Sequence, residues 1–510
     1  MHVPLTTRDF LRRAALVYGD RIGIVDEPDR PGSWGALTYR ALGARARAVG
    51  AGLDALGVGA GERVAIVSHN AARFVAALHG VCDAGRSLVP INFRLHAHEV
   101  EYIASHSGAR VLLVDPELDA SLAGVKTEHR FTLDEASDRA LFLHPGTPRD
   151  VTLAETDCAT LNYTSGTTAR PKGVRLTHRN LWLNATTFGW HAGVGDRDVF
   201  MHVVPTFHAN GWGMPFALSA MGAGQIILRK VDGAEILRRV ERHGVTLLCG
   251  APAVVSAILE AAAKCTGPIP GRGRTRIVVA GAPPPTRTIE RVETELGWEF
   301  IQIYGLTETS PFLTINRGRA EYDALTPAER AVRLGRAGAP AVGNEVRADA
   351  QGEILARGNV VMDGYWDDPA ATATAIREGW LHTGDGGTVD AEGYVSISDR
   401  KKDVIITGGE NVSSIEVEDC LASHAEVAEV AVIGVPHEKW GETVKALVVL
   451  RGGASATEAD LIAHCRGQLA HYKCPTSVEL RSELARTATG KLQKFLLRAP
   501  YWEGRTRQVN

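Results

Sequence analysis

Short runs of β-branched residues alternate with helical patterns over the first 300 residues, and this alternation limits the available folds more than any other feature. Gly, Pro or Asp bounds each run, and apolar residues recur at helical spacing between the runs. A strand that alternates with a helix predicts an α/β fold, with parallel sheets covered by helices on both faces. The predicted strands are 63–68, 110–115, 225–230, 246–251, 276–281 and 300–304, and the predicted helices are 71–83, 181–189, 234–243, 252–263 and 284–296.

The pattern changes in the last third of the chain. From about 343 to 398, short strands with Gly turns predict a small antiparallel element. Beyond the charged segment 398–403, the order helix, strand, strand, helix, strand predicts a small α+β unit that folds around its own core. A chain of 510 residues is also too long for one core. We therefore predict a large N-terminal domain, 1–399, and a small C-terminal domain, 400–510.

Composition excludes several classes of partner. The chain has 56 Lys+Arg against 59 Asp+Glu, so it carries no basic surface that would favour nucleic acid or an anionic membrane. No apolar run is long enough for a membrane span, and the amino terminus does not resemble an export signal. The seven cysteines are scattered singly, which predicts reduced, mostly buried thiols and a cytoplasmic location.

The segment YTSGTTARPKGV, 163–174, is the first candidate site. It follows a strand-like stretch and precedes a helix-like one, at 177–184. Small hydroxyl residues and Gly let backbone N–H groups and Oγ atoms surround phosphate oxygens, and Lys172 adds a positive charge. The loop is not a Walker A motif, because no Gly precedes Lys172 and Gly173 follows it. Taken alone, the segment could also be a polar surface turn.

This loop resembles that of the adenylate-forming enzymes, which include acyl-CoA synthetases, firefly luciferase and the adenylation domains of peptide synthetases. Their loop reads YTSGTTGxPKGV, and this chain differs by Ala169. The resemblance continues over nearly the whole chain in the family's order and is closest to the fatty-acyl-CoA synthetases. It implies ATP as a substrate. The implied phosphate-binding residues are Thr164, Ser165, Gly166, Thr167, Thr168 and the catalytic Lys172.

Two further stretches resemble the family's acyl and adenine pockets. VPTFHANGWGMP, 204–215, places the catalytic His208 beside the carboxylate site, with Trp212 as the gate of an acyl tunnel and Gly213 in its wall. AGAP, 280–283, implies contacts of Gly281, Ala282 and Pro283 with adenine, and of Gly281 with the acyl group. The simpler interpretations are a hydrogen-bonded core histidine and a strand-to-helix turn.

The stretch QIYGLTE, 302–308, is predicted to contact adenine, the α-phosphate and the metal ion. Tyr304 offers a ring for adenine, Gly305 borders both the nucleotide and the acyl group, and Thr307 offers a hydroxyl for the α-phosphate. Glu308 is a hard oxygen ligand for Mg²⁺, with Thr164 as a second ligand. The alternative for Glu308 is a solvated side chain after a strand.

The remaining motifs lie around the predicted domain boundary. In WLHTGD, the resemblance implies that Asp385 accepts hydrogen bonds from both ribose hydroxyls, that Arg400 also contacts the ribose, and that Lys402 is the hinge. The alternative for the charged cluster around 400 is a solvated linker.

The C-terminal domain carries the last group of predicted residues. Gly408 and Gly409, beside Glu410, let a pantetheine arm pass the backbone, and Trp440 is a weaker candidate for contact with coenzyme A. The resemblance implies that this domain is mobile and that the catalytic Lys491 bridges the acyl carboxylate and the α-phosphate, where its ammonium would stabilise the developing charge. Taken alone, Trp440 is a packed cap and Lys491 an exposed lysine.

These parts imply an acyl-CoA synthetase that works in two half-reactions, with ATP, Mg²⁺ and coenzyme A. The expected acid is hydrophobic, either a medium or long fatty acid or a bulky aryl or polycyclic acid. Three alternatives stay open: transfer of the adenylate to a carrier protein's phosphopantetheine, a luciferase-like oxidation, and a catalytically silent nucleotide-binding protein. A homodimer is an expectation of the family resemblance.

Overall fold

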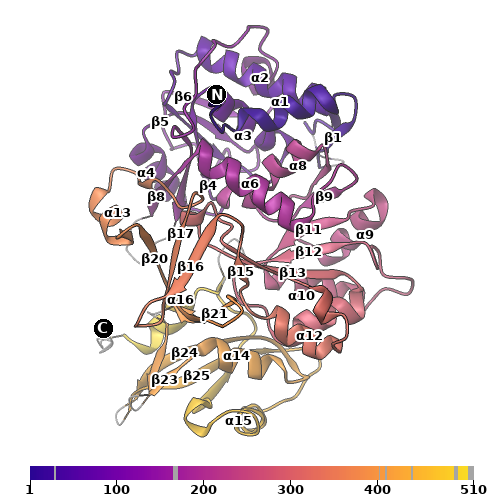
Figure 1. Ribbon diagram of the computed structural model, residues 1–510, viewed down its shortest axis with the longest axis vertical. Helices are drawn as coiled ribbons and strands as arrows, with labels where there is room; N and C mark the ends of the chain where they lie inside the picture. Colours follow the sequence, from indigo (N-terminus) through magenta and orange to yellow (C-terminus); the bar gives the residue numbers. More distant parts are fainter. Residues whose placement is uncertain are drawn as a thin grey trace.

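The computed structural model describes residues 1–27, 30, 32–164, 171–400, 403–407, 410–437, 440–486 and 492–503, without the side chains of 399, 400 and 411. Within these residues the protein is a mixed α/β structure with four sheets (Figure 1). The predicted α/β class is therefore confirmed, and each of the six predicted strands and five predicted helices overlaps an observed element of the same kind.

A nine-stranded sheet forms one half of the large body. Its central strands run parallel, and antiparallel strands complete both edges. The carboxyl ends of the parallel strands therefore lie at one edge of the sheet. In spatial order the strands are β15 (Ala339–Pro340), β14 (Thr314–Arg317), β13 (Glu299–Tyr304), β12 (Arg276–Val279), β11 (Leu247–Gly250), β9 (Val199–His202), β10 (Gly224–Ile227), β1 (Ile22–Val25) and β2 (Ala36–Thr38).

A seven-stranded sheet forms the other half, and its edge differs from the prediction. The strands on either side of the predicted phosphate loop pair antiparallel, because 172–177 forms a strand before the helix begins at His178. Val174 and Leu176 are fully buried on this strand, which explains why it pairs with its neighbour. The order is β18 (Gly364–Tyr365), β8 (Lys172–Thr177), β7 (Cys158–Thr164), β4 (Ser87–Ile91), β3 (Arg63–Val67), β5 (Ala109–Val114) and β6 (His129–Thr132).

Helices cover both sheets, and one hydrophobic cluster contains residues from both. Phe200 of the nine-stranded sheet and Val64 of the seven-stranded sheet belong to it, together with the buried helix 72–83. The two sheets therefore share one core and together form the body of the protein. Its helices of six residues or more are α1 (Arg8–Val17), α2 (Tyr39–Ala55), α3 (Ala72–Asp83), α4 (Ala97–Ser107), α6 (His178–Ala192), α8 (Met214–Met221), α9 (Gly233–His243), α10 (Pro252–Ala262), α11 (Thr286–Arg291) and α12 (Pro327–Leu334).

A small antiparallel sheet follows, as the Gly turns predicted. In Figure 1 it lies between the two large sheets and the C-terminal part of the chain. Helix α13 (Pro369–Ala375) precedes its strand β19. The strands are β16 (Asn344–Ala348), β17 (Glu353–Gly358), β20 (Trp380–Val389), β19 (Ile376–Arg377) and β21 (Val395–Arg400).

The C-terminal part, called the lid below, has its own sheet and core. The predicted order of helix, strand, strand, helix, strand is confirmed, with a further short hairpin before it. The boundary at residue 399 stays a prediction. The lid contains β22 (Ile405–Thr407), β23 (Glu410–Val412), α14 (Ser414–Ala422), β24 (Val427–His437), β25 (Gly441–Leu450), α15 (Glu458–Arg466), β26 (Ser477–Leu480) and α16 (Lys494–Arg498).

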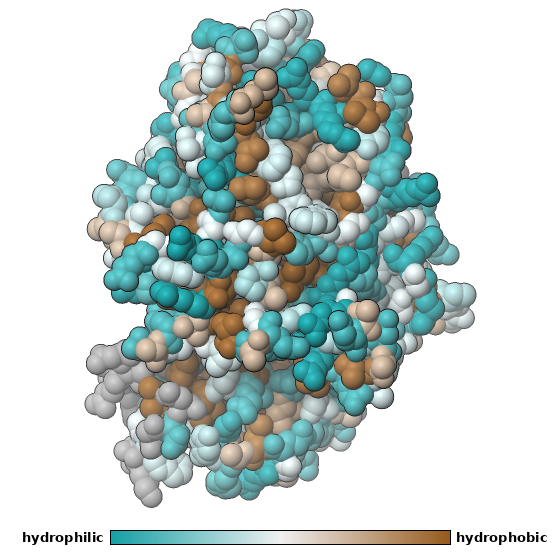
Figure 2. Space-filling model, viewed as in Figure 1, coloured by the Kyte–Doolittle hydropathy of each residue, from teal (hydrophilic) through white to brown (hydrophobic). Residues whose placement is uncertain are grey.

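The surface is mostly hydrophilic in the view of Figure 2, with hydrophobic residues gathered near the centre of that face. Among the helices of the described residues, none is long and apolar enough to cross a membrane.

Candidate active site

Three of the predicted site segments follow parallel strands of the nine-stranded sheet. The stretch 203–213 follows β9, Ala280–Pro283 follows β12, and Gly305–Thr309 follows β13. The strands β12 and β13 are direct neighbours, with Val279 opposite Gln302. Ligands of parallel sheets bind beyond the carboxyl ends of their strands. The fold therefore brings the predicted acyl, adenine and metal segments to one edge of the sheet.

A hydrogen bond joins this edge to the small antiparallel sheet. The hydroxyl of Tyr304 donates to Oδ2 of Asp385 at 2.7 Å. Asp385 is only 5% exposed, and its backbone N–H donates to Oγ1 of Thr383. In the backbone register, Asp385 lies opposite Arg400. Tyr304, which is predicted to contact adenine, therefore lies beside the strand pair that carries Asp385 and Arg400, the two residues predicted to contact the ribose.

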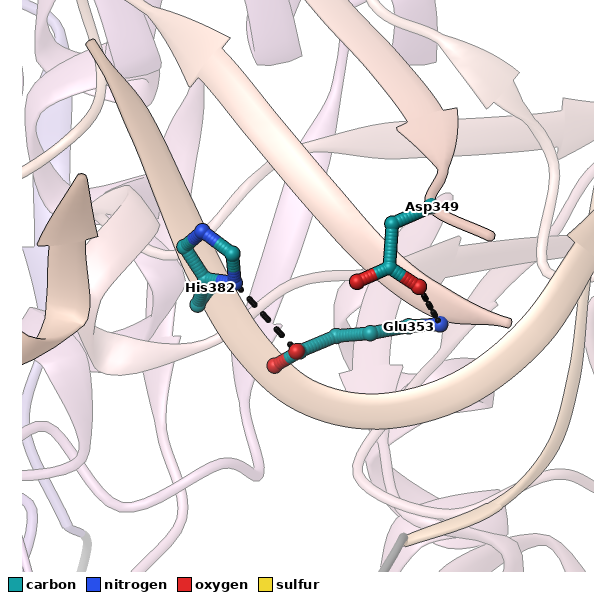
Figure 3. A group of neighbouring side chains, drawn as sticks. All are labelled: Asp349, Glu353 and His382. Carbon is teal, nitrogen blue, oxygen red and sulfur yellow. Dashed lines mark hydrogen bonds and ion pairs between the residues drawn. The ribbon is translucent and has the colours of Figure 1, made fainter. Parts of the chain in front are cut away.

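A cluster of three polar side chains holds the turn at Gly384, directly before Asp385. Figure 3 shows Asp349, Glu353 and His382, whose ligand atoms all lie within 4.8 Å of one another. Oε1 of Glu353 accepts from the N–H of Gly384 at 2.9 Å, and Oε2 lies 3.2 Å from Nδ1 of His382. The guanidinium of Arg377 lies 2.7 Å from the same His382 nitrogen, so a cation already occupies this side of the group. We interpret the group as a structural brace for the turn that presents Asp385.

Glu308 and Lys172 both contact the side chain of Tyr365. The hydroxyl of Tyr365 donates to Oε1 of Glu308 at 2.9 Å, and Nζ of Lys172 lies 5.1 Å from the centre of the same ring. Burial and the Glu308 carboxylate raise the pKa of Tyr365, so its hydroxyl remains a proton donor. An open cavity of about 340 Å³ is lined by Lys172, Tyr365, Thr383 and Gly384, among others. The predicted phosphate lysine and the turn before Asp385 therefore border the same space.

The donor atoms around Glu308 suit a magnesium ion. Within the described residues, Oε2 of Glu308 makes no hydrogen bond, so one carboxylate oxygen can serve as a ligand. Strand β8 packs against the short helix η3 (Thr307–Thr309) that carries Glu308. Thr164 lies opposite Lys172 in the adjoining hairpin, so its hydroxyl belongs to the same region. Carboxylate and hydroxyl oxygens are hard ligands of the kind that Mg²⁺ prefers.

Two glycines at this edge have a structural requirement. A Cβ on Gly305 would overlap the carbonyl oxygen of Pro311, which is backbone and cannot move aside cheaply. Gly281 has a φ of 97°, a conformation that L side chains rarely adopt. Both turns after β12 and β13 therefore depend on the absence of a side chain.

The predicted acyl stretch has an unusual backbone. After the half-buried His208, the residues Ala209, Asn210 and Trp212 all have positive φ, at 36°, 53° and 57°. Nδ2 of Asn210 donates to Oγ1 of Thr160 at 2.9 Å, which ties the turn to β7. Strained backbone of this kind concentrates at functional sites. A Cβ on Gly213, the next residue, would overlap the side chain of Asn184.

Trp212 is packed as a core residue. It is 5% exposed and belongs to the main hydrophobic cluster together with Phe207. The ring of Phe207 in turn meets Phe93 edge-on, with 5.6 Å between the ring centres. Aromatic side chains therefore fill the space behind His208.

The remaining predicted residues are either described without a contact that tests their role or lie outside the described part of the chain. Glu410 is exposed on β23, and the exposed ring of Trp440 stacks on His437 with 4.7 Å between centres. Arg400 is described only in its backbone. For all of these residues the predicted role stays a prediction. Those outside the described residues are Ser165, Gly166, Thr167, Thr168, Lys402, Gly408, Gly409 and Lys491.

Sequence reasoning missed two features of the site. Tyr365 is 57 residues from Glu308, so no local pattern could pair them, although the aromatic pair Tyr365–Trp366 after a glycine was a visible signal. Asp419 of the lid accepts from the backbone N–H of Thr286 at 2.8 Å and from its hydroxyl at 3.1 Å. This contact joins the lid to the helix that begins directly after the predicted adenine stretch.

Two family models match the chain. The model described as AMP-binding enzyme matches residues 11–366, and the one described as AMP-binding enzyme C-terminal domain matches residues 416–491.

Relatives and solved structures cover nearly the full length. A 2-methylpropanoate–CoA ligase of Humulus lupulus is 35% identical, over 97% of this chain and 95% of its own. The crystal structure of an anthranilate CoA ligase with anthranoyl-AMP aligns with a TM-score of 0.87 at 27% identity, over 98% of both chains. The o-succinylbenzoate CoA synthetase of Bacillus subtilis, in complex with ATP and magnesium, aligns with a TM-score of 0.80 at 28% identity, over 96% of this chain and 99% of its own.

Proposed function

This chain belongs to the AMP-binding enzyme family and is an acid–thiol ligase, and from that premise we propose that it joins a compact hydrophobic carboxylic acid to coenzyme A through an acyl-adenylate. One observation carries the residue assignment. Tyr365 contacts both the carboxylate of Glu308 and the ammonium of Lys172, and it lines one cavity together with Lys172 and the turn Thr383–Gly384 that precedes the ribose candidate Asp385.

The proposed first step uses charge neutralisation and alignment. A carboxylate oxygen of the acid attacks the α-phosphorus of ATP, the bond to the bridging oxygen breaks, and pyrophosphate leaves with its electron pair. Lys172 and the hairpin loop bind the phosphates, Thr307 donates to the α-phosphate, and Asp385 accepts from the ribose hydroxyls. A bound magnesium ion would add positive charge beside the phosphate oxygens, held by Glu308 and Thr164.

The proposed second step exchanges AMP for the thiol. The thiol of coenzyme A gives up its proton to water, its sulfur attacks the acyl carbon, and AMP leaves with the electron pair of its bond to that carbon. We assign Lys491 to the first step, Lys402 to the hinge, and the turn at Gly408 and Gly409 with Glu410 to the pantetheine path. Trp440 is assigned to a contact with coenzyme A. The lid touches the body through polar contacts such as Thr286 with Asp419, which supports a lid that rotates between the two steps.

The packing around Trp212 supports a compact acid. Of the two acids predicted from the sequence, a long fatty chain needs a tunnel that Trp212 would have to vacate, and Trp212 is almost fully buried in the core. His208 would face the carboxylate, with the apolar part of the acid against Gly281, Gly305 and the aromatic residues. The relatives named for 2-methylpropanoate and anthranilate act on small acids, which supports the same proposal.

Pyrophosphate exchange over a panel of acids tests the proposal. Purified protein with MgATP and labelled pyrophosphate should form labelled ATP with branched C4–C6 or single-ring acids at least tenfold faster than with a C16 acid. Addition of coenzyme A should then yield the thioester. Exchange with no acid in the panel would contradict the function, and preference for the C16 acid would contradict only the compact pocket.

Free coenzyme A is the proposed acceptor, and a phosphopantetheinylated carrier protein is the alternative. The two are distinguished by supplying each to the preformed acyl-adenylate and measuring the rate of AMP release. The cytoplasmic location and the homodimer stay predictions.

A further inference from the structure

Tyr365 has no role in the proposed chemistry, yet it contacts two groups that do. Its hydroxyl donates to Glu308, and its ring faces the ammonium of Lys172. A single side chain therefore touches both the proposed metal ligand and the proposed phosphate ligand.

The position of Tyr365 does not depend on Glu308. Strand β18, which contains it, pairs with β8, so that Tyr365 lies opposite Val174. Its backbone N–H donates to Oγ1 of Thr372 at 2.9 Å, and the backbone N–H of Trp366 donates to the carbonyl oxygen of Gly173 at 2.7 Å. These contacts hold the backbone of Tyr365 independently of Glu308, so the side chain that bonds Glu308 starts from a fixed backbone position.

The contact orients one oxygen of Glu308 and leaves the other for a ligand. A hydrogen bond to Oε1 fixes the rotation of the carboxylate, so Oε2 points in a defined direction. Outer partners that orient a metal ligand in this way contribute strongly to metal affinity in proteins.

The same side chain contacts two opposite charges. Lys172 and Glu308 form no ion pair with each other in the described residues; the hydroxyl of Tyr365 bonds Glu308, and its ring contacts the ammonium of Lys172. A cation is attracted to the face of an aromatic ring, so Lys172 has a favourable position that does not consume the carboxylate. A direct pair between Lys172 and Glu308 would compete with phosphate and metal for both groups.

We propose that Tyr365 is a positioning residue that orients Glu308 toward the magnesium ion of bound MgATP and holds Lys172 away from that carboxylate. The inference rests on the proposed function, because the roles of Glu308 and Lys172 are proposed there. The ligand concerned is the metal–nucleotide complex, whose binding Tyr365 affects through Glu308.

The first test is Tyr365→Phe, which removes the hydroxyl and keeps the ring and the backbone pairing. Calorimetric titration of the purified protein should show MgATP binding weakened roughly tenfold, since loss of an outer partner costs about 10–100-fold in metal affinity. Binding of AMP, measured without metal, should be unchanged. The Mg²⁺ concentration for half-maximal pyrophosphate exchange should rise by a similar factor, with the KM of the acid unchanged. Equal weakening of MgATP and AMP binding would overturn the inference.

The second test asks whether Tyr365 acts through Glu308. In a Glu308→Gln background, adding Tyr365→Phe should change MgATP binding less than twofold, because the oriented carboxylate is already gone. A full tenfold loss in that background would contradict the proposal.

Tyr322→Phe is the matched control. Tyr322 is a buried tyrosine of the body, and its hydroxyl accepts from Arg336 at 2.8 Å, away from the site. It should leave both titrations unchanged, and a loss as large as that of Tyr365→Phe would attribute the effect to general loosening and overturn the inference. If the unaltered protein neither binds MgATP nor exchanges pyrophosphate, the proposed function fails; if it does both and Tyr365→Phe binds MgATP normally, only this inference fails.

Discussion

The body and the lid are held together by different kinds of contact. Within the body, one hydrophobic cluster contains side chains of both large sheets, so the sheets cannot separate without exposing apolar surface. Among the described residues, no hydrophobic cluster contains side chains from both body and lid. The described contacts between them include Asp419 with Thr286 and the guanidinium of Arg287 with the carbonyl oxygen of Ser423 at 2.7 Å.

This difference bears on how the two regions divide the work. Polar contacts exchange readily with water, so a lid attached by them moves at a small cost in free energy, whereas the body remains rigid. The groups proposed to bind the nucleotide lie in the body, and the groups proposed to change between steps lie in the lid. Variants on either side should therefore differ in which half-reaction they affect.

The largest expected effect is the loss of acyl-adenylate formation when the lid residue Lys491 is replaced. Lys491→Ala should reduce acyl-adenylate formation about 10²–10³-fold, because it removes a charge that stabilises the transition state. Thioester formation from supplied acyl-adenylate should change little. Rapid-quench measurement of each half-reaction tests this, with Lys473→Ala as a lid control whose ammonium pairs with Glu416 at 2.7 Å. Equal loss in both half-reactions would contradict the assignment.

The body counterpart is Gly305→Ala, for which we expect a loss of about 10²-fold in both half-reactions. The added Cβ would overlap the carbonyl oxygen of Pro311 and displace the segment that carries Thr307 and Glu308. Gly318→Ala is the control, because nothing lies within 4 Å of a Cβ there and its φ is not positive. If only one half-reaction suffered, the body would not serve both steps.

The free energy of unfolding should depend on pH through a buried histidine of the body and not through an exposed histidine of the lid. Burial lowers the pKa of His202 in the body to about 4, and its Nε2 lies 2.9 Å from Oε1 of Gln225. The unfolded chain binds a proton at this residue below pH ~6.5 while the folded protein does not. Stability is therefore lost as the pH falls from ~6.5 toward ~4, by up to about 3 kcal/mol.

His202→Gln should remove this contribution. The fall in the free energy of unfolding between pH 7 and pH 4.5, measured by urea denaturation, should be smaller in the variant than in the unaltered protein. His471→Gln, at an exposed position of the lid, should leave the fall unchanged. An identical fall in His202→Gln and the unaltered protein would contradict this account of the buried histidine.

The smallest effect is expected at the proposed hinge. Lys402→Pro restricts one backbone torsion, so thioester formation should slow about tenfold while adenylate formation changes less than threefold. Both rates come from the same rapid-quench experiment. Unaltered rates of both steps would remove Lys402 from the hinge, and Lys402→Ala distinguishes loss of the charge from loss of backbone freedom.

Much of the fold was predictable because it depends on local patterns. The strand 63–67 and the helix 72–83 were expected from periodicity and Gly boundaries within a few residues. The hairpin at 158–177 was not expected as such, because the glycine and hydroxyl residues of the phosphate loop indicate a turn without indicating that the chain pairs back on itself. Pairing between strands is a tertiary choice that depends on which partner buries the apolar face.

The sequence alone determined the family, the order of the motifs and the chemical types at the site, because those depend on residue identity and spacing along the chain. Only the tertiary structure decided that Tyr365 joins Glu308 to Lys172, that Trp212 packs into the core, and that Asp419 meets Thr286. These contacts link residues up to 193 positions apart, as between Lys172 and Tyr365. Contacts at such separations arise when strands and helices pack against each other, and local propensity carries no information about which partners will meet.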